Sequence, residues 1–339
     1  MPVAMTSQIF ECGNVKLQSG EVLSATQIAY RTYGRPNADA SNAILFPTWY
    51  SSRDVQNEWL IGTGRPLDPE RWFIIVPNLI GNGLSTSPSN AAPPADKGRF
   101  PRVTVYDNVL LQRRLLTERL GVDRIALAIG RSMGAMQAFQ WACLFPDKVA
   151  RLLAITGAAR VSPHNYVFLA GLKAALTADP AWNGGDYKSP PMTGLRAFGR
   201  VYAGWIYSQA WYRQHCYRQE VEASIEGFLE AKWDTNFAGR DANNLLSQLD
   251  TWQQGDISAN PVFHGDFDRA LGAIKARSIV MPCRSDLYFP PEDSAGEVER
   301  MPEAELRVLP SIGGHRAGGP NSDPADIAFV ERAIADLLQ

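Results

Sequence analysis

The sequence of 339 residues has little excess charge and no long hydrophobic run. Its 33 lysines and arginines nearly balance its 35 aspartates and glutamates, so the net charge is −2. No basic patch or charge block marks a surface for nucleic acid or for a membrane. No apolar run approaches the roughly 18 residues of a membrane-spanning helix. We therefore expect small molecules, or a second copy of the chain, as partners.

Cysteine is also scarce, and the four that occur, Cys12, Cys143, Cys216 and Cys283, lie far apart in the chain. Their spacing matches no metal-ligand pattern, and we interpret them as free, mostly buried thiols. The first ten residues lack the basic region and the apolar stretch of a signal peptide. Together these features predict a cytoplasmic protein that needs neither a metal nor another cofactor.

Short apolar runs do recur along the chain, and they are continuous rather than alternating. They span residues 43–46, 72–76, 125–129, 152–156 and 278–281. Such runs are typical of strands in a mostly parallel sheet that is covered on both faces. Helical spacing over 105–120 and 135–145 separates several of them. The alternation predicts an α/β fold with a doubly wound sheet.

The strand rhythm stops after Ser162 and resumes at about residue 269. The interval contains helix-like stretches and five tryptophans: Trp182, Trp205, Trp211, Trp233 and Trp252. We interpret 163–268 as a helical lid inserted into an α/β core made of 1–162 and 269–339. These aromatic residues could form a lid over a site or an interface. The alternative is that they pack the interior of the insertion.

The strongest local motif is Gly130-Arg-Ser-Met-Gly134, which follows an apolar run and precedes a helix. A serine on such a sharp strand-to-helix turn has an exposed hydroxyl, and the flanking glycines let neighbouring backbones approach. The helix that follows directs its first amides toward the serine. The motif predicts Ser132 as a nucleophile.

A serine hydroxyl needs a general base within hydrogen-bond reach. Of the four histidines, only His315 follows the last apolar run, Leu306–Leu309, in a turn-rich loop before a C-terminal helix over 324–338. Asp286 follows the penultimate apolar run, in the chain order that this kind of triad uses. Glu292 and Asp293 are weaker alternatives, because they lie deeper in the following segment. We predict a Ser132–His315–Asp286 triad.

Two backbone amides should complete the site by binding the negative oxygen of an acyl intermediate. One is expected from Met133, directly after the nucleophile, and the other from the loop after residues 43–46, at Trp49. The large side chains of Tyr50 and Tyr207 are expected either to narrow the pocket toward small acyl groups or simply to pack.

At this point the residues resemble a known family. The elbow with Met136-Gln-Ala and Trp141 is similar to that of homoserine O-acetyltransferases, as are Leu60–Asp68, Val103–Asp107 and Arg240–Asn243. The resemblance covers nearly the whole chain. It implies an α/β-hydrolase core with a helical lid, and a homodimer paired through that lid. It also implies that Arg200 binds a substrate carboxylate, with Tyr207 beside it.

One departure from the family decides the expected reaction. The transferases usually carry an aspartate directly after the catalytic histidine, where it holds the amine of homoserine, whereas this chain has Arg316. A cation at that position opposes an ammonium group, and a desolvated amine without an acidic partner binds poorly. The chain therefore looks more like the branch of ester hydrolases that act on short-chain alkyl acetates. Arg316 is expected to contact the substrate.

Three functions remain open from the sequence. The first is hydrolysis of small acetate-type esters through an acyl-serine intermediate. The second is acyl-CoA-dependent O-acetyl transfer to homoserine or another alcohol, which would use the same triad. The third is a non-catalytic binding protein, which the complete set of serine, aspartate and histidine disfavours.

Overall fold

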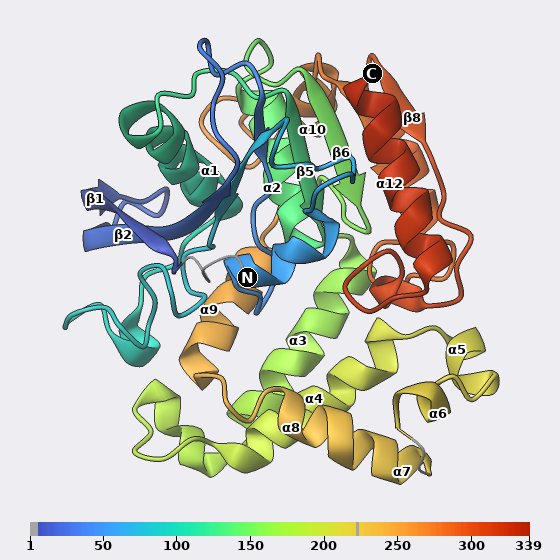
Figure 1. Ribbon diagram of the computed structural model, residues 1–339. Coiled ribbons are helices and arrows are strands. Elements are labelled where there is room, and N and C mark those ends of the chain that lie inside the picture. Colours follow the sequence, from blue (N-terminus) through green and yellow to red (C-terminus); the bar gives the residue numbers. More distant parts are fainter. Residues whose placement is uncertain (1–5, 222–223) are drawn as a thin grey trace.

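The computed structural model describes residues 6–221 and 224–339. One sheet forms the upper half of the molecule in Figure 1, and a layer of helices lies below it. The strands are β1 (Gln8–Lys16), β2 (Val22–Tyr33), β3 (Ala43–Leu45), β4 (Phe73–Pro77), β5 (Leu127–Arg131), β6 (Arg151–Ile155), β7 (Arg277–Met281) and β8 (Ala304–Leu306). Their order in the sheet is β1-β2-β4-β3-β5-β6-β7-β8.

Strands β3 to β8 pair in parallel, whereas β1 and β2 add an antiparallel edge. The five apolar runs of the sequence correspond to β3, β4, β5, β6 and β7, so the predicted α/β class and parallel sheet are confirmed. The hairpin of β1 and β2 was not predicted, because its residues alternate between buried and exposed positions and include many polar side chains. Such strands need a neighbour before their apolar face can be recognised.

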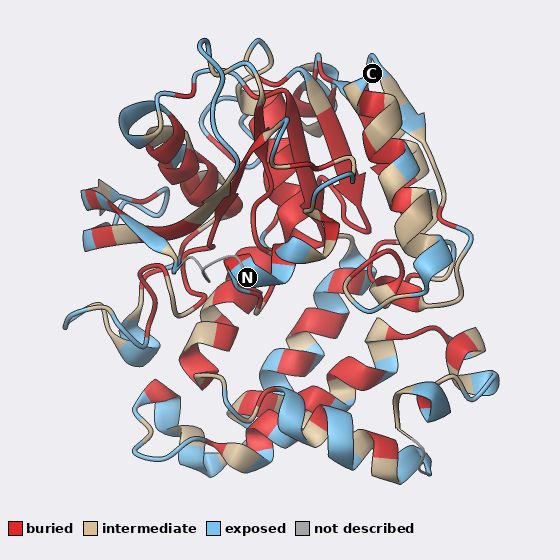
Figure 2. Cartoon of the chain, in the orientation of Figure 1, coloured by how far each residue is buried: buried red, intermediate tan, exposed pale blue. Residues whose placement is uncertain are grey.

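Helices cover both faces of the sheet. On one face, α1 (Val105–Arg114), α2 (Met133–Leu144) and α10 (Phe267–Gly272) share a hydrophobic cluster with the strands. On the other face, α12 (Pro324–Leu338) packs through Val330, Ile334 and Leu337. The central strands are buried throughout (Figure 2), because both of their faces are covered. Helix α11 (Pro291–Val298) precedes β8.

The predicted helical insertion forms the lower layer of Figure 1. It consists of α3 (Pro163–Thr177), α4 (Met192–Ile206), α5 (Gln209–Arg213), α6 (Tyr217–Glu220), α7 (Ile225–Phe228), α8 (Asp234–Asn236) and α9 (Ala242–Gln253). These helices share their own hydrophobic cluster, to which all five tryptophans belong or adjoin. The tryptophans therefore pack the interior of the lid.

The segment after α9 lies within the expected insertion of 163–268, but it packs with the core. Ile257 and Phe263 belong to the cluster that α2 shares with the sheet, and the Gln140 side chain donates to the Ile257 carbonyl at 3.1 Å. The segment after α9 thus lies on the α/β core. The difference arises because this segment lacks strand character and so resembles the preceding helices in sequence.

Candidate active site

The Gly-x-Ser-x-Gly motif forms a sharp turn between β5 and α2. Ser132 has φ 54° and ψ −127°, a region that non-glycine residues rarely occupy, and Met133 begins the helix. The sheet and the helix hold Ser132 in this conformation: its amide donates to Ile155 O at 2.9 Å, and its carbonyl accepts from the Ala135 amide at 2.9 Å. The hydroxyl is thereby presented at the carboxyl edge of the sheet.

Glycines are required around this turn because there is no space for a side chain. A Cβ at Gly130 would lie 2.1 Å from the Gly134 carbonyl carbon, and one at Gly134 would lie 2.8 Å from Pro47 O. At Gly157, on the neighbouring strand end, a Cβ would lie 2.7 Å from Ser132 O. The backbone segments of the site therefore approach more closely than any other residue permits.

The three residues predicted as a triad come together at this edge. Ser132 Oγ lies 3.0 Å from His315 Nε2, and His315 Nδ1 lies 2.8 Å from Asp286 Oδ2. All three are buried, with exposures of 2%, 2% and 4% for Ser132, His315 and Asp286. Asp286 can therefore hold the proton of His315 on Nδ1, which leaves Nε2 free to accept a proton from Ser132. Glu292 and Asp293 lie within α11 and do not occupy this position.

The segment after β7 fixes both the acid and the base. Asp286 Oδ1 accepts hydrogen bonds from the Tyr288 amide at 2.7 Å and the Phe289 amide at 3.4 Å. The rings of Tyr288 and Phe289 lie 4.3 Å and 5.7 Å from that of His315. Burial lowers the pKa of His315, and the Asp286 carboxylate opposes that shift. The imidazole is thus held as a neutral base in an apolar setting.

The oxyanion amides differ in part from the prediction. The Trp49 amide donates to Ser52 Oγ at 2.8 Å, so it is already engaged. Among the residues that the structure describes, the Met133 and Tyr50 amides have no hydrogen-bond partner. The second amide is therefore better placed on Tyr50, one residue after the expected position. The local turn that engages Ser52 could not be read from the sequence.

Arg200 does not take the expected role. Its guanidinium binds Asp234 through two hydrogen bonds of 2.7 and 2.8 Å, and Glu226 at 2.8 Å. The side chain is 39% exposed on the outer part of the lid, and its charge is already balanced by two carboxylates. The spacing to Tyr207 matched the family, but the acidic partners come from segments more than twenty residues away and override it.

Tyr207 and Arg316 do lie together, beside the His315 loop. Arg316 Nη1 donates to the Tyr207 hydroxyl at 3.2 Å, and that hydroxyl donates to Glu220 Oε1 at 3.0 Å. The three residues line a cavity of about 570 Å³ between the lid and the 311–326 segment. Glu220 is therefore an acidic group near Arg316, but the two are connected only by hydrogen bonds to the Tyr207 hydroxyl between them. Nothing in the local sequence signalled Glu220.

The side chain of Tyr50 packs against the lid. Its hydroxyl donates to Leu245 O at 3.2 Å, and its ring packs near Tyr202 and Trp252 at 6.1 Å and 5.6 Å. Tyr202 also adjoins Tyr288, which in turn covers His315. Aromatic side chains of the lid thus continue to the triad. Tyr202 and Tyr288 were not predicted, because only the tertiary packing brings them to the site.

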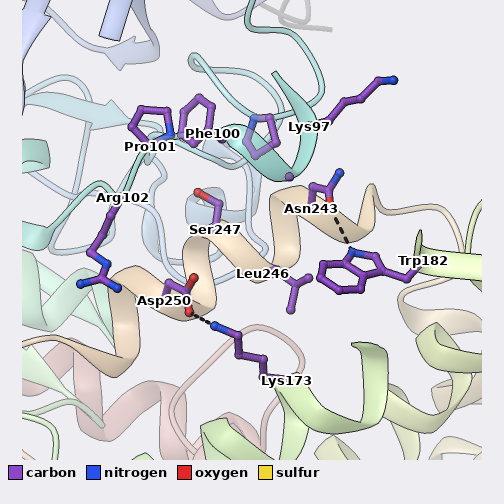
Figure 3. Close-up of a pocket in the computed structure, with 12 residues that line it drawn as sticks. Lys97, Phe100, Pro101, Arg102, Lys173, Trp182, Asn243, Leu246, Ser247 and Asp250 are labelled. Carbon is purple, nitrogen blue, oxygen red and sulfur yellow. Dashed lines mark hydrogen bonds and ion pairs between the residues drawn. The ribbon is translucent and has the colours of Figure 1, made fainter. Parts of the chain in front are cut away.

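A second cavity, of about 310 Å³, is distinct from this site (Figure 3). It is lined by side chains of α9, of α3 and of the segment Pro88–Arg102. Lys173 pairs with Asp250 at 2.8 Å, and Trp182 Nε1 donates to Asn243 at 3.1 Å, so these polar groups satisfy one another. The cavity separates the lid from the core on the side away from Arg316.

Neither a metal cluster nor a membrane span is found in the described ranges, 6–221 and 224–339. No group of three or more potential ligands among His, Cys, Asp and Glu is placed to hold an ion there. None of the helices there is long and apolar enough to cross a bilayer.

Comparisons with known proteins agree with this geometry. Residues 44–315 match the family of the alpha/beta hydrolase fold. An ethyl acetate hydrolase of Pseudomonas veronii is 39% identical, over 98% of this chain and 95% of its own. A homoserine O-acetyltransferase of Nostoc punctiforme is 32% identical, over 89% of this chain and 88% of its own.

The structural comparison gives the same result. The crystal structure of an acetylester hydrolase from Corynebacterium glutamicum superposes with a TM-score of 0.94 and 38% identity, over 98% of this chain and 95% of that one. The expected resemblance is confirmed, and the identity is higher to the ester hydrolases than to the transferase. The chain belongs to the α/β-hydrolase fold family, in the branch that contains acetyl ester hydrolases and homoserine O-acetyltransferases.

Proposed function

We propose that the protein hydrolyses short-chain, acetate-type carboxylic esters through an acyl-Ser132 intermediate. The observation that carries the proposal is the buried chain of hydrogen bonds from Ser132 through His315 to Asp286. The greater identity to named acetate ester hydrolases supports the same substrate class.

The reaction follows from the positions of these groups. Ser132 Oγ attacks the ester carbonyl carbon while His315 Nε2 takes the hydroxyl proton, and the carbonyl oxygen becomes negative. The amides of Met133 and Tyr50 bind that oxygen. As the tetrahedral intermediate collapses, His315 returns the proton to the departing alcohol. Water then attacks the acyl-serine with His315 again as base, which releases the acid and restores Ser132.

The aromatic walls favour a small acyl group. Ser132 is only 2% exposed, and Tyr50, Met133 and Trp252 are buried in the same cluster as the lid interior. A long acyl chain would have to displace these close-packed side chains, which is unfavourable. Acetate and propionate esters should therefore be turned over faster than octanoate esters of the same alcohol.

Arg316 favours water over homoserine as the acceptor. A transferase must bind its alcohol well enough to compete with water at about 55 M, so it needs an organised site for the alcohol's charged groups. Here the residue after His315 is a cation held by Tyr207. Arg200, the expected carboxylate ligand, is bound to two carboxylates. The site therefore lacks both a free cation at Arg200 for the homoserine carboxylate and an anion after His315 for its ammonium group.

The test compares hydrolysis of ethyl acetate with acetyl transfer from acetyl-CoA to homoserine in one preparation. We expect hydrolysis, with no O-acetylhomoserine above background. Efficient acetylation of homoserine by the unmodified protein would instead establish the transferase. Arg316→Asp should raise any transfer that exists, while Arg213→Asp, on the lid surface, serves as the charge-matched control.

We further propose that the protein is a cytoplasmic homodimer that pairs through its lid. Tyr166 and Val167 on α3 are 51% and 63% exposed, and such apolar side chains favour an interface. The free cysteines suit a reducing compartment. Light scattering should give twice the chain mass for the wild type and a monomer for Val167→Asp, whereas a monomeric wild type would contradict the dimer.

A further inference from the structure

Arg131, the residue before the nucleophile, places a guanidinium in the interior of the site. The residue is 6% exposed, and its Nε has no hydrogen-bond partner among the described residues. Among the described residues, no carboxylate forms an ion pair with Arg131. A buried cation without a paired anion is costly. The elbow itself does not need an arginine, because the turn depends on glycines and on the serine.

The guanidinium contacts the two segments that flank Ser132. Its Nη2 donates a hydrogen bond to the backbone carbonyl of His315. Its Cζ lies 5.8 Å from the ring centre of Trp49, in the loop that presents the Tyr50 amide. Gly319 completes the enclosure: a Cβ there would lie 2.6 Å from Arg131 Nε and 2.9 Å from Cζ. One side chain thus joins the base, the oxyanion loop and the elbow.

We propose that Arg131 is a positioning residue for ester hydrolysis, which holds the His315 main chain and the Trp49 loop in register with Ser132. The inference rests on the proposed function of the Ser132 site. His315 is then held at two points: Asp286 fixes the ring through Nδ1, and Arg131 fixes the backbone. A base displaced by about 1 Å can lose roughly 100-fold in rate, so such a support has a measurable effect.

The charge of Arg131 also acts on the base. Burial lowers the pKa of Arg131 to about 10, which leaves the group positive at neutral pH. Asp286 favours that positive charge, whereas Arg131 contributes to lowering the pKa of His315. Removal of the cation should therefore raise the pKa of His315 and move the acid limb of activity to higher pH. A purely space-filling side chain would not affect this limb.

The first experiment measures kcat/KM for ethyl acetate against pH in Arg131→Met and Arg131→Lys. Arg131→Met should lose about 100-fold in kcat/KM and move its acid limb to higher pH, as expected for loss of a nearby positive charge. Arg131→Lys retains the charge, so its acid limb should stay at the wild-type position while kcat/KM falls. Arg300→Met removes an exposed arginine that pairs with Asp268, and should change neither property.

The second experiment displaces the guanidinium without removing it. Gly319 does not have a positive φ, and the three atoms nearest a Cβ at Gly319 all belong to the Arg131 guanidinium. Gly319→Ala should lower kcat/KM by at least about tenfold in the wild type but hardly at all in an Arg131→Ala background. Gly296→Ala is the matched control, because its Cβ would meet the Arg300 guanidinium at an ordinary 3.5 Å.

The outcomes separate this inference from the proposed function. Wild-type rates and an unshifted acid limb in folded Arg131→Met would overturn the positioning role, even if Ser132→Ala abolishes hydrolysis. Additive effects of Gly319→Ala and Arg131→Ala would also overturn it. Loss of hydrolysis with an unchanged acid limb in Arg131→Met would reduce Arg131 to a packing residue. Full hydrolysis by Ser132→Ala would instead refute the proposed function.

Discussion

The α/β core and the helical lid hold their parts of the site in different ways. In the core, backbone geometry positions Ser132, since the turn has a positive φ and leaves no space for a Cβ at Gly130 or Gly134. In the lid, packing between side chains positions the residues, as in the stacking of the Tyr207 and Trp211 rings, whose centres lie 3.8 Å apart. The core therefore supplies a rigid reaction centre, whereas the lid supplies walls that can vary.

Two exposed glycines of the lid differ from those of the elbow, although Gly194 and Gly199 on α4 are as closely packed as Gly130, with a Cβ 2.4 Å from Leu176 O and 2.1 Å from Trp233 O. A methyl group added at Gly171 on α3 or at Gly204 on α4 would meet nothing within 4 Å, although both residues lie inside helices. At the elbow glycines no side chain fits, whereas at Gly171 and Gly204 a side chain would change only the helix propensity. We expect an added methyl group to have a large effect at the elbow glycines and a small effect at Gly171 and Gly204.

The largest expected effect is on the nucleophile. Ser132→Ala should leave a folded protein and lower kcat by about six orders of magnitude, as for triad serines elsewhere. Ser278→Ala removes an equally buried hydroxyl from β7 and should leave the rate near that of the wild type. A fluorophosphonate probe should label Ser132 in stoichiometric amount. Labelling at Ser285 or Ser311 would move the site.

The acid should have the next largest effect. Asp286→Asn cannot hold His315 in the required tautomer, and kcat should fall by about 10⁴. Asp293→Asn, on α11, changes a carboxylate outside the hydrogen-bonded triad and should leave kcat unchanged. Steady-state rates at pH 8 with ethyl acetate provide the measurement. Equal losses in both variants would show that Asp286 has no special role.

A methyl group added to each region should give opposite changes in stability. Gly130→Ala brings Cβ to 2.1 Å from backbone, so the free energy of unfolding should fall by more than about 3 kcal/mol. Gly171→Ala should raise it by about 0.5–1 kcal/mol, because alanine is the better helix former. Urea denaturation followed by circular dichroism measures both. A destabilised Gly171→Ala would mean that the lid packs as tightly as the elbow.

The last effect depends on pH and concerns the junction of the two regions, at Glu297. This buried carboxyl accepts from the Ala159 and Arg160 amides at 2.8 and 3.3 Å, where the chain leaves β6 for the lid. Burial raises the pKa of Glu297 from 4.5 to about 8. Between these values the native state keeps a proton that the unfolded chain has lost, so stability falls as pH rises.

Glu297→Gln removes that titration. Relative to the variant, the wild type should lose on the order of 1 kcal/mol of unfolding free energy per pH unit across this window. Denaturation at pH 5, 6.5 and 8 measures the difference, with the exposed Glu299→Gln as control. A constant difference between wild type and Glu297→Gln would show that Glu297 does not titrate in this range.

Much of the core and its reaction centre could be predicted from the sequence. The five strand runs, the elbow at Ser132 and the order of Asp286 and His315 all depend on short-range patterns, and the structure places each where it was expected. The hairpin of β1 and β2 was missed, because half of its residues face solvent and carry no continuous apolar signal.

The lid side of the site could not be predicted in the same way. Arg200 and Tyr207 had the spacing of a substrate-binding pair, yet Arg200 binds Asp234 and Glu226 instead. The Trp49 amide donates to Ser52 Oγ, which is why we propose the neighbouring Tyr50 amide for the oxyanion. Each outcome depends on partners that are distant in sequence, or on a local turn that no residue pattern specifies.

The sequence by itself determined the fold class, the family and which serine, histidine and aspartate come together at the strand ends. Strand and helix periodicity and the glycines of the elbow reflect interactions between near neighbours, which a sequence records directly. Only the tertiary structure decided what surrounds them: Tyr288 against His315 with Tyr202 packed on Tyr288, Glu220 bonded to Tyr207, and Arg131 bonded to the His315 carbonyl. These contacts join separate segments of the chain, and their free energy depends on burial and geometry that exist only after the chain has folded.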